Sequence, residues 1–171
     1  MRRANGDESN RWWKTAGFAA AFLFLGLQAA PVAPPRVNPP VERKLTVHAD
    51  PSVPQPVKEI LGRSCMNCHS NATMWPWYSR VAPASWFVAQ DVADGRQALN
   101  FSEWGAKKPP VQAALAAAAC ANVRSGKMPL PRYLLLHPGA RLSEAEKDIL
   151  CAWSEDALRS LARPRQTRTT E

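Results

Sequence analysis

The sequence predicts a mostly α-helical fold, with one small helical domain that follows an N-terminal helix and a proline-rich segment. A chain of 171 residues with 46% apolar residues can bury a single core and carry appendages. A Ser-x-x-Glu capping box at residues 143–146 precedes a stretch with apolar residues along one helical face. Residues 111–124 are rich in alanine, which has the highest helix propensity.

The pentapeptide CMNCH at residues 65–69 has the pattern C-x-x-C-H, which is typical of covalent c-type haem attachment. We expect the thiols of Cys65 and Cys68 to form thioethers with the two haem vinyl groups, because two intervening residues let one helical turn reach both. His69 would then lie beneath the iron as the proximal ligand, held there by the tether at high effective concentration. The sequence therefore predicts one covalently bound haem c, with its iron on His69.

Three other sites could use the same thiols, namely a dithiol redox centre, a structural zinc site and a plain disulfide. A thioredoxin-like dithiol would need a preceding strand and a lowered thiol pKa, and residues 56–61 are not a convincing strand. A zinc site would need a second ligand pair, whereas Cys120 and Cys151 are far apart in the chain. The haem site is therefore favoured.

The chain carries a net charge of +8, which is spread along its length. The terminal segments 1–14 and 163–171 hold +2 each, which leaves +4 for the residues between them. A moderate excess of this kind suits an acidic redox partner protein or an anionic membrane surface. The Lys and Arg residues are scattered and no nucleic-acid motif accompanies them, so we expect no nucleic-acid partner.

An apolar run close to the N-terminus indicates a targeting or anchoring segment. Residues 1–14 are polar and basic, as expected of a cytoplasmic segment, and residues 15–30 read as a signal-anchor or a signal peptide. The run at 15–27 is short for a span of about 20 residues, yet Trp12 and Trp13 suit a membrane interface. The small residues after it fit a cleavage site poorly, so an N-terminal membrane helix is favoured. We expect the domain on the periplasmic side of the inner membrane, anchored by this helix, or in the periplasm after cleavage.

Residues 31–55 are expected to form an extended linker that holds the domain away from the membrane. Proline fixes φ and withdraws a backbone donor, and the pairs at 34–35 and 39–40 favour a polyproline-like conformation. His48 lies in this segment without partner ligands, so it is not expected to bind a metal.

Residues 56–162 are predicted to be the haem-binding domain. Pro56 can begin a short helix that runs into the C-x-x-C-H motif. Gly95 is predicted to end a helix over 84–94, and Pro164 to end the last helix. Irregular connections lie between the helices, and the basic tail at 163–171 is expected to be disordered.

The sequence offers one favoured sixth ligand for the iron. Met128 lies in the segment KMPLP, where the following proline disfavours a helical conformation and stiffens the loop. It stands 59 residues after His69, which leaves room for the chain to wrap round the ring. His137 is the competing ligand, while Met74 is too close to His69 in the chain. Filling of a core gap by Met128 remains the alternative.

The second pair of cysteines leaves two alternatives open. Cys120 and Cys151 both fall on predicted helices. In an oxidising compartment they could form a disulfide, or they could remain two buried free thiols.

Several longer motifs in a fixed order resemble those of the haem-binding domain family of exported bacterial proteins with one C-x-x-C-H. The resemblance extends from about Arg36 to Trp153 and implies a periplasmic or membrane-tethered monohaem protein with a small cytochrome c-like domain wrapped around one haem. Cys65, Cys68 and His69 are the positions that carry over. The motifs are RVNPP at 36–40, CMNCHSN at 65–71, WPWYS at 75–79, AP at 82–83, LNFSEW at 99–104, SGKMPLP at 125–131 and Y-x-x-x-HP at 133–138.

Electron transfer is the favoured function. Ligation by His69 and Met128 favours a high reduction potential and leaves no vacant position for a substrate. A haem-based sensor or small-ligand binder with a labile sixth ligand is the alternative. A peroxidase-like enzyme would need an open iron and a distal acid-base group, for which His137 is the only obvious residue, so no enzymatic activity is expected.

Overall fold

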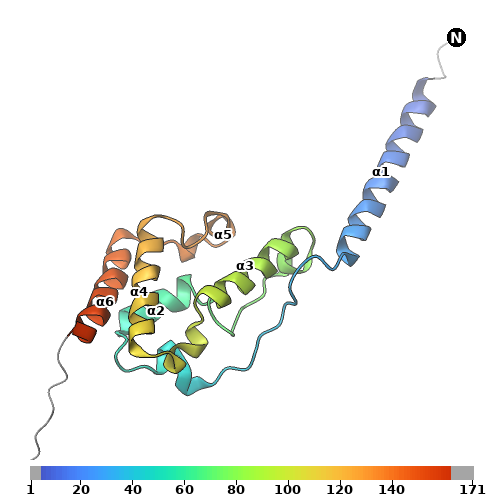
Figure 1. The fold of residues 1–171 in the computed structure, drawn as a ribbon. Helices are drawn as coiled ribbons and strands as arrows, with labels where there is room; N and C mark the ends of the chain where they lie inside the picture. Colours follow the sequence, from blue (N-terminus) through green and yellow to red (C-terminus); the bar gives the residue numbers. More distant parts are fainter. Residues whose placement is uncertain (1–4, 163–171) are drawn as a thin grey trace, which may run out of the picture. The chain divides into compact units, whose positions relative to one another are not determined.

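The computed structural model describes residues 5–162, and its regular secondary structure over that range is entirely helical (Figure 1). The mostly α-helical fold is therefore confirmed. The described chain divides into two compact units. The N-terminal unit comprises residues 5–36 and 75–91, and the C-terminal unit comprises residues 37–74 and 92–162. The predicted disordered tail at 163–171 lies outside the described residues, as does the start of the predicted cytoplasmic segment.

The N-terminal unit contains the long helix α1 (Asn5–Ala29), the short 3₁₀ helix η3 (Trp77–Arg80) and the first half of α3 (Ala84–Ala98). The side-chain amide of Gln28 ties the end of α1 to this unit, because its oxygen accepts from the Ala82 N–H at 2.9 Å and its nitrogen donates to the Ala82 carbonyl at 3.5 Å. Two backbone groups are satisfied by one side chain.

The N-terminal helix is longer than predicted, and its apolar stretch falls short of the predicted membrane helix. Across residues 5–162, no helix has an apolar stretch long enough to cross a bilayer. The physical reason is that α1 begins in the polar, charged part of the sequence, so that only residues 15–27 form an uninterrupted apolar run. This is shorter than the about 20 residues that a span requires.

The C-terminal unit has its core among α2 (Gln55–Ser64), η4 (Phe101–Ala106), α4 (Pro109–Arg124) and α6 (Glu144–Ala162). Three rings form its centre: Phe101 and Trp104 lie 6.1 Å apart, and Trp104 and Trp153 lie 5.5 Å apart, centroid to centroid. Aromatic side chains bury large apolar areas and contribute strongly to such a core. The aliphatic residues around the rings are Val47, Val53, Val57, Ile60, Leu61, Val123, Leu142 and Leu150.

The helix signal at the start of α6 is confirmed, whereas α4 begins two residues earlier than the predicted 111–124. Pro109 is the first residue of α4, because its fixed φ suits the first turn of a helix. Ser143 and Glu146 form the predicted capping box, with the Ser143 N–H donating to Glu146 Oε2 at 2.8 Å and the Glu146 N–H donating to Ser143 Oγ at 3.3 Å. Between them lie the short helices α5 (Pro131–Leu136) and η5 (Pro138–Ala140).

The segment predicted as an extended linker folds onto the core over its second half. Its residues form two 3₁₀ helices, η1 (Arg43–Leu45) and η2 (Val47–Ala49), and both pack against η4. Val47 is completely buried, and Asp50 accepts a hydrogen bond from the Trp104 indole at 3.0 Å. The extended conformation that the proline content predicted is therefore wrong for this half, because its few apolar side chains are buried in the core.

The predicted end of α3 at Gly95 is wrong, because α3 continues to Ala98. A Cβ atom at position 95 would lie 2.7 Å from the carbonyl oxygen of Cys68 and 3.1 Å from its Cβ. Real Cβ atoms do not approach a backbone oxygen so closely. Glycine is therefore required here for the close approach of α3 to the C-x-x-C-H turn, and not to end a helix.

Candidate haem-binding site

The C-x-x-C-H motif continues α2 by one further turn. Helix α2 buries Val57 and Leu61 in the core, which fixes its orientation. The Cys65 N–H donates to the Leu61 carbonyl at 2.9 Å, and the N–H groups of Cys68 and His69 donate to the Cys65 carbonyl at 3.2 and 3.0 Å. The two thiols and the imidazole therefore lie on a single turn, as two-point attachment to one ring requires.

The imidazole of His69 is held in one tautomer. Its Nδ1 lies 2.9 Å from the carbonyl oxygen of Leu99. A carbonyl oxygen can only accept, so Nδ1 carries the proton. Burial lowers the pKa of His69, partly opposed by the backbone oxygens of Leu99 and Gly95, and the ring is therefore neutral with a lone pair on Nε2. A histidine that binds a metal has this arrangement, with the second nitrogen bonded to a carbonyl.

His69, Cys65 and Met128 line one cavity in the C-terminal unit. Its empty space, open mouth included, is about 710 Å³. Cys68 lies on the same turn but not on the cavity wall. The walls are almost entirely apolar, which would exclude water from a ring bound there. The remaining lining residues are Leu61, Ser64, Ala98, Leu99, Phe101, Leu115, Ala118, Ala119, Asn122, Val123, Pro129 and Leu150.

Two polar side chains in this wall have unused hydrogen-bonding capacity. Ser64 is 7% exposed, and its hydroxyl is buried without a hydrogen-bond partner among residues 5–162. The side-chain amide of Asn122 makes no hydrogen bond with another residue in the described range. Buried polar groups are normally paired, so both suit a bound molecule with polar groups, as haem is.

Of the candidate sixth ligands, the structure brings only Met128 to the cavity. Met128 is half-buried against the core, and its N–H donates to the Asn122 carbonyl at 3.1 Å, which fixes the loop after α4. His137 instead stacks on Tyr133, with centroids 4.2 Å apart, and is not part of the cavity wall. Met74 is 78% exposed, and His48 Nε2 lies 3.0 Å from the sulfur of Met66.

The Cys65 thiol does not have the lowered pKa that is typical of a redox dithiol. Burial, with a smaller contribution from Cys68, raises the pKa of the Cys65 thiol to about 12, whereas reactive dithiols have lowered pKa values. Neither Cys65 nor Cys68 belongs to a disulfide. In the part of the chain that the structure describes, no cluster of three His, Cys, Asp or Glu side chains could hold a metal ion.

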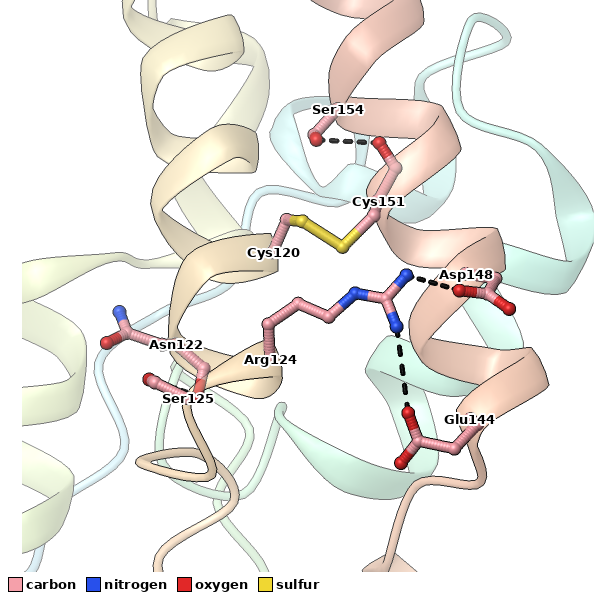
Figure 2. The surroundings of a disulfide bond; sticks show 8 residues. All are labelled: Cys120, Asn122, Arg124, Ser125, Glu144, Asp148, Cys151 and Ser154. Atoms are coloured by element: carbon pink, nitrogen blue, oxygen red, sulfur yellow. Dashed lines mark hydrogen bonds and ion pairs between the residues drawn. A yellow bond between two sulfur atoms is a disulfide. The ribbon is translucent and has the colours of Figure 1, made fainter.

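Cys120 and Cys151 form a disulfide, which decides between the two alternatives for this pair. The bond joins α4 to α6, with the Cα atoms 4.9 Å apart (Figure 2). Arg124, at the end of α4, adds ion pairs to Asp148 and, at 3.6 Å, to Glu144 on α6. Together these contacts fix the end of α4, from which the Met128 loop departs. In Figure 2 the Asn122 side chain points away from α6.

Arg96, which no sequence pattern singled out, holds the turn after the motif in place. Its guanidinium donates to the carbonyls of Ser70 and Val37 at 2.8 and 2.7 Å, and to Asn38 Oδ1 and Thr73 Oγ1, both at 2.8 Å. A single side chain therefore joins the RVNPP segment to the residues after His69. No local sequence pattern indicates these hydrogen bonds, since the partners of Arg96 are 23 to 59 residues away in the chain.

A family model described as a haem-binding domain matches residues 22–156 of the chain. The chain belongs to the haem-binding domain family. The match covers both α1 from residue 22 and the whole cavity wall, so this haem-binding protein has its expected site inside the matched region. No curated protein and no solved structure matches the chain.

The residues of the cavity fit a haem. The wall is apolar, and the neutral imidazole has a free Nε2 lone pair. The buried Ser64 hydroxyl has no hydrogen-bond partner in the described chain and could bond to a polar group of the ring. Haem supplies an iron that accepts axial nitrogen and sulfur ligands.

Proposed function

We propose that this haem-binding protein carries one haem c on Cys65 and Cys68, with His69 and Met128 as axial ligands, and that it transfers electrons. The observation that carries the proposal is that a neutral imidazole of fixed tautomer and a thioether line the same apolar cavity. The bound iron would supply the change of oxidation state. The remaining tasks belong to the protein chain.

Each residue has a defined task in this proposal. Cys65 and Cys68 would hold the haem covalently, because each S–H bond can add across one vinyl group, with the sulfur bonded to one vinyl carbon and the hydrogen to the other. His69 offers its Nε2 lone pair, while Leu99 keeps the proton on Nδ1. Met128 would offer its thioether sulfur to the same iron, and an iron without a vacant position in apolar surroundings would favour electron transfer over substrate chemistry.

We also propose that the protein acts on the periplasmic side of the inner membrane. The disulfide between Cys120 and Cys151 supports an oxidising compartment. Helix α1 supports contact with the membrane, since Phe18, Phe22 and Leu25 are exposed on it. The positive net charge supports an acidic redox partner protein.

The first test is an absorption spectrum of the haem-loaded full chain in both oxidation states, with carbon monoxide added to the reduced form. A sulfur-to-iron band and no response to carbon monoxide are expected. Met128→Ala should lose the band, lower the reduction potential and bind carbon monoxide. Met74→Ala is the matched control, because this methionine is exposed and should change none of the three. Unchanged spectra in Met128→Ala would overturn the ligand assignment.

Covalent attachment is tested with the two cysteine pairs of the same chain. After denaturation, haem should stay with the wild type and with Cys120→Ala/Cys151→Ala, and should be extracted from Cys65→Ala/Cys68→Ala. Retention of haem by the last variant would contradict thioether attachment.

A second candidate function is a small-ligand sensor with a labile sixth ligand. The observation that favours it is the Asn122 amide, which lines the cavity beside Met128 and could donate to a diatomic ligand on the iron. A wild-type spectrum that shifts with carbon monoxide would support this function over electron transfer.

A further inference from the structure

The N-terminal unit contains a second cavity, which is unlike the haem cavity because it is polar. It lies where α1 ends and α3 begins. It is lined by Gln28 and residues 30, 31 and 33–36 from the end of α1 and the chain after it, and by Arg80, Ser85 and Trp86. Its empty space, open mouth included, is about 640 Å³. None of its residues belongs to the haem cavity, so the two sites are chemically independent.

Two arginine side chains line this cavity without a compensating charge. Within the described residues, Arg36 and Arg80 make no ion pair and no hydrogen bond through their guanidinium groups. No acidic side chain belongs to the cavity wall. By contrast, Arg63, Arg124 and Arg159 all pair with carboxylates. The cavity therefore concentrates positive charge that nothing in the described chain neutralises.

A hydroxyl group in the wall also has no protein partner. Ser85 is 4% exposed as a residue, and its hydroxyl makes no hydrogen bond within residues 5–162, although its oxygen keeps contact with solvent, unlike the oxygen of Ser64. Other buried serines differ, since the Ser79 hydroxyl donates to the Pro76 carbonyl at 2.6 Å. Ser85 is the second residue of α3, so the positive end of that helix dipole faces the same region.

We propose that this cavity binds a phosphate group, with Arg36 and Arg80 as the charged donors and Ser85 as the neutral donor. The planar guanidinium groups match the oxygens of a phosphate monoester or diester. The ligand neutralises both arginines and accepts a hydrogen bond from the Ser85 hydroxyl. Free phosphate and the headgroup of an anionic phospholipid share this chemistry.

Two exposed aromatic side chains of the same unit make the lipid source specific enough to test. Trp77 and Phe87, in the same unit, are 78% and 60% exposed. Exposed aromatic side chains beside arginines are typical of surfaces that meet a membrane interface. A lipid whose phosphate enters the cavity could place its acyl chains against these rings.

The test uses the haem-loaded full chain in a non-ionic detergent and isothermal titration calorimetry. One titrant is inorganic phosphate, and the other is dihexanoyl phosphatidylglycerol below its micellar concentration. Arg36→Gln/Arg80→Gln should weaken binding at least tenfold for each guanidinium removed, and Ser85→Ala should weaken it severalfold. Arg43→Gln/Arg141→Gln, which removes the same charge elsewhere, should bind as the wild type does. The haem spectrum must stay unchanged in all variants, since it reports the C-terminal unit alone.

The outcomes separate the two sources and can overturn the proposal. At least tenfold tighter binding of the short-chain lipid than of inorganic phosphate identifies a headgroup site. Equal or weaker binding of the lipid identifies a free-phosphate site. No saturable binding of either titrant, or equal losses in Arg36→Gln/Arg80→Gln and the control, overturns the proposal. If circular dichroism shows that the double variant has lost helix, Ser85→Ala decides, and unchanged affinity in it overturns the proposal.

Discussion

Replacing Gly95 by alanine should destabilise the protein, although the same change inside most helices is favourable. Glycine costs about 0.5–1 kcal/mol relative to alanine in a helix interior, and Gly95 lies inside α3. The new methyl group would stand 2.7 Å from the Cys68 carbonyl oxygen. That oxygen belongs to a turn held by backbone hydrogen bonds, so it cannot move aside as a flexible side chain would.

The magnitude follows from these two opposing effects. Overpacking of a tight contact costs about 1–3 kcal/mol, and a backbone partner places Gly95→Ala at the upper end. After the helix gain, the expected net loss is about 2 kcal/mol. Gly62→Ala is the matched control inside α2, because its methyl group would meet only the His48 ring, at 3.9 Å. It should gain about 0.5–1 kcal/mol.

Urea denaturation of the full chain, followed by circular dichroism, measures both variants. With a denaturant slope of about 1–2 kcal/mol per molar urea, Gly95→Ala should lower the midpoint by about 1–2 M and Gly62→Ala should raise it. The yield of attached haem should also fall in Gly95→Ala, since the clash displaces Cys68. An increase in midpoint for Gly95→Ala equal to that of Gly62→Ala, with normal haem yield, would refute the close packing of α3 on the motif.

Three further changes have expected outcomes. The chain-entropy relation for a separation of 31 residues gives a stabilisation of about 3–4 kcal/mol for the Cys120–Cys151 bond. Cys120→Ser/Cys151→Ser should lower the free energy of unfolding, measured by urea denaturation, by that amount, and a decrease below about 1 kcal/mol would contradict this value. Arg96→Met should lose about 2–4 kcal/mol, because four hydrogen-bond acceptors lose their donor; near wild-type thermal stability would contradict the role of Arg96. Hydrogen bonds, of which that from the Ser143 N–H is the strongest, lower the pKa of Glu146 in the folded protein. The stability that the ionised Glu146 contributes is therefore complete above the ordinary pKa of a glutamate, and it is lost as the pH falls through the lowered pKa of the folded state. The unfolding free energy of Glu146→Gln should therefore depend less on pH in acid, and an unchanged acid profile would contradict this.

The elements that sequence predicted well are those whose signals are local. The capping box at Ser143 acts within a single turn, so α6 begins where the sequence indicates. Gly95 can likewise be interpreted from local sequence, as the end of a helix. The structure shows that glycine is needed there because Cys68, 27 residues away in the chain, packs against it. A glycine inside a helix can therefore not be interpreted until its packing partner is known.

The prediction of an extended linker at residues 31–55 was wrong over its second half for a related reason. Proline withdraws backbone donors, which argues for an extended chain, but burial depends on side chains that lie between the prolines. Val47 and Val53 enter the core, and Asp50 accepts from the Trp104 indole. Trp104 comes 54 residues after Asp50, so this pairing is a tertiary property that composition does not contain.

The same distinction between local and tertiary determinants applies to the candidate site. Its proximal half, from Cys65 to His69, is one turn of chain, so this local geometry could be predicted from five letters, while the attachment of haem there stays a prediction. Its distal half depends on α4, which has a weak apolar pattern and is held against α6 by the Cys120–Cys151 bond and the ion pairs of Arg124. Met128 follows directly from that end of α4. A perturbation of the α4–α6 contact should therefore reach Met128 while His69, fixed by Leu99 and α2, keeps its place.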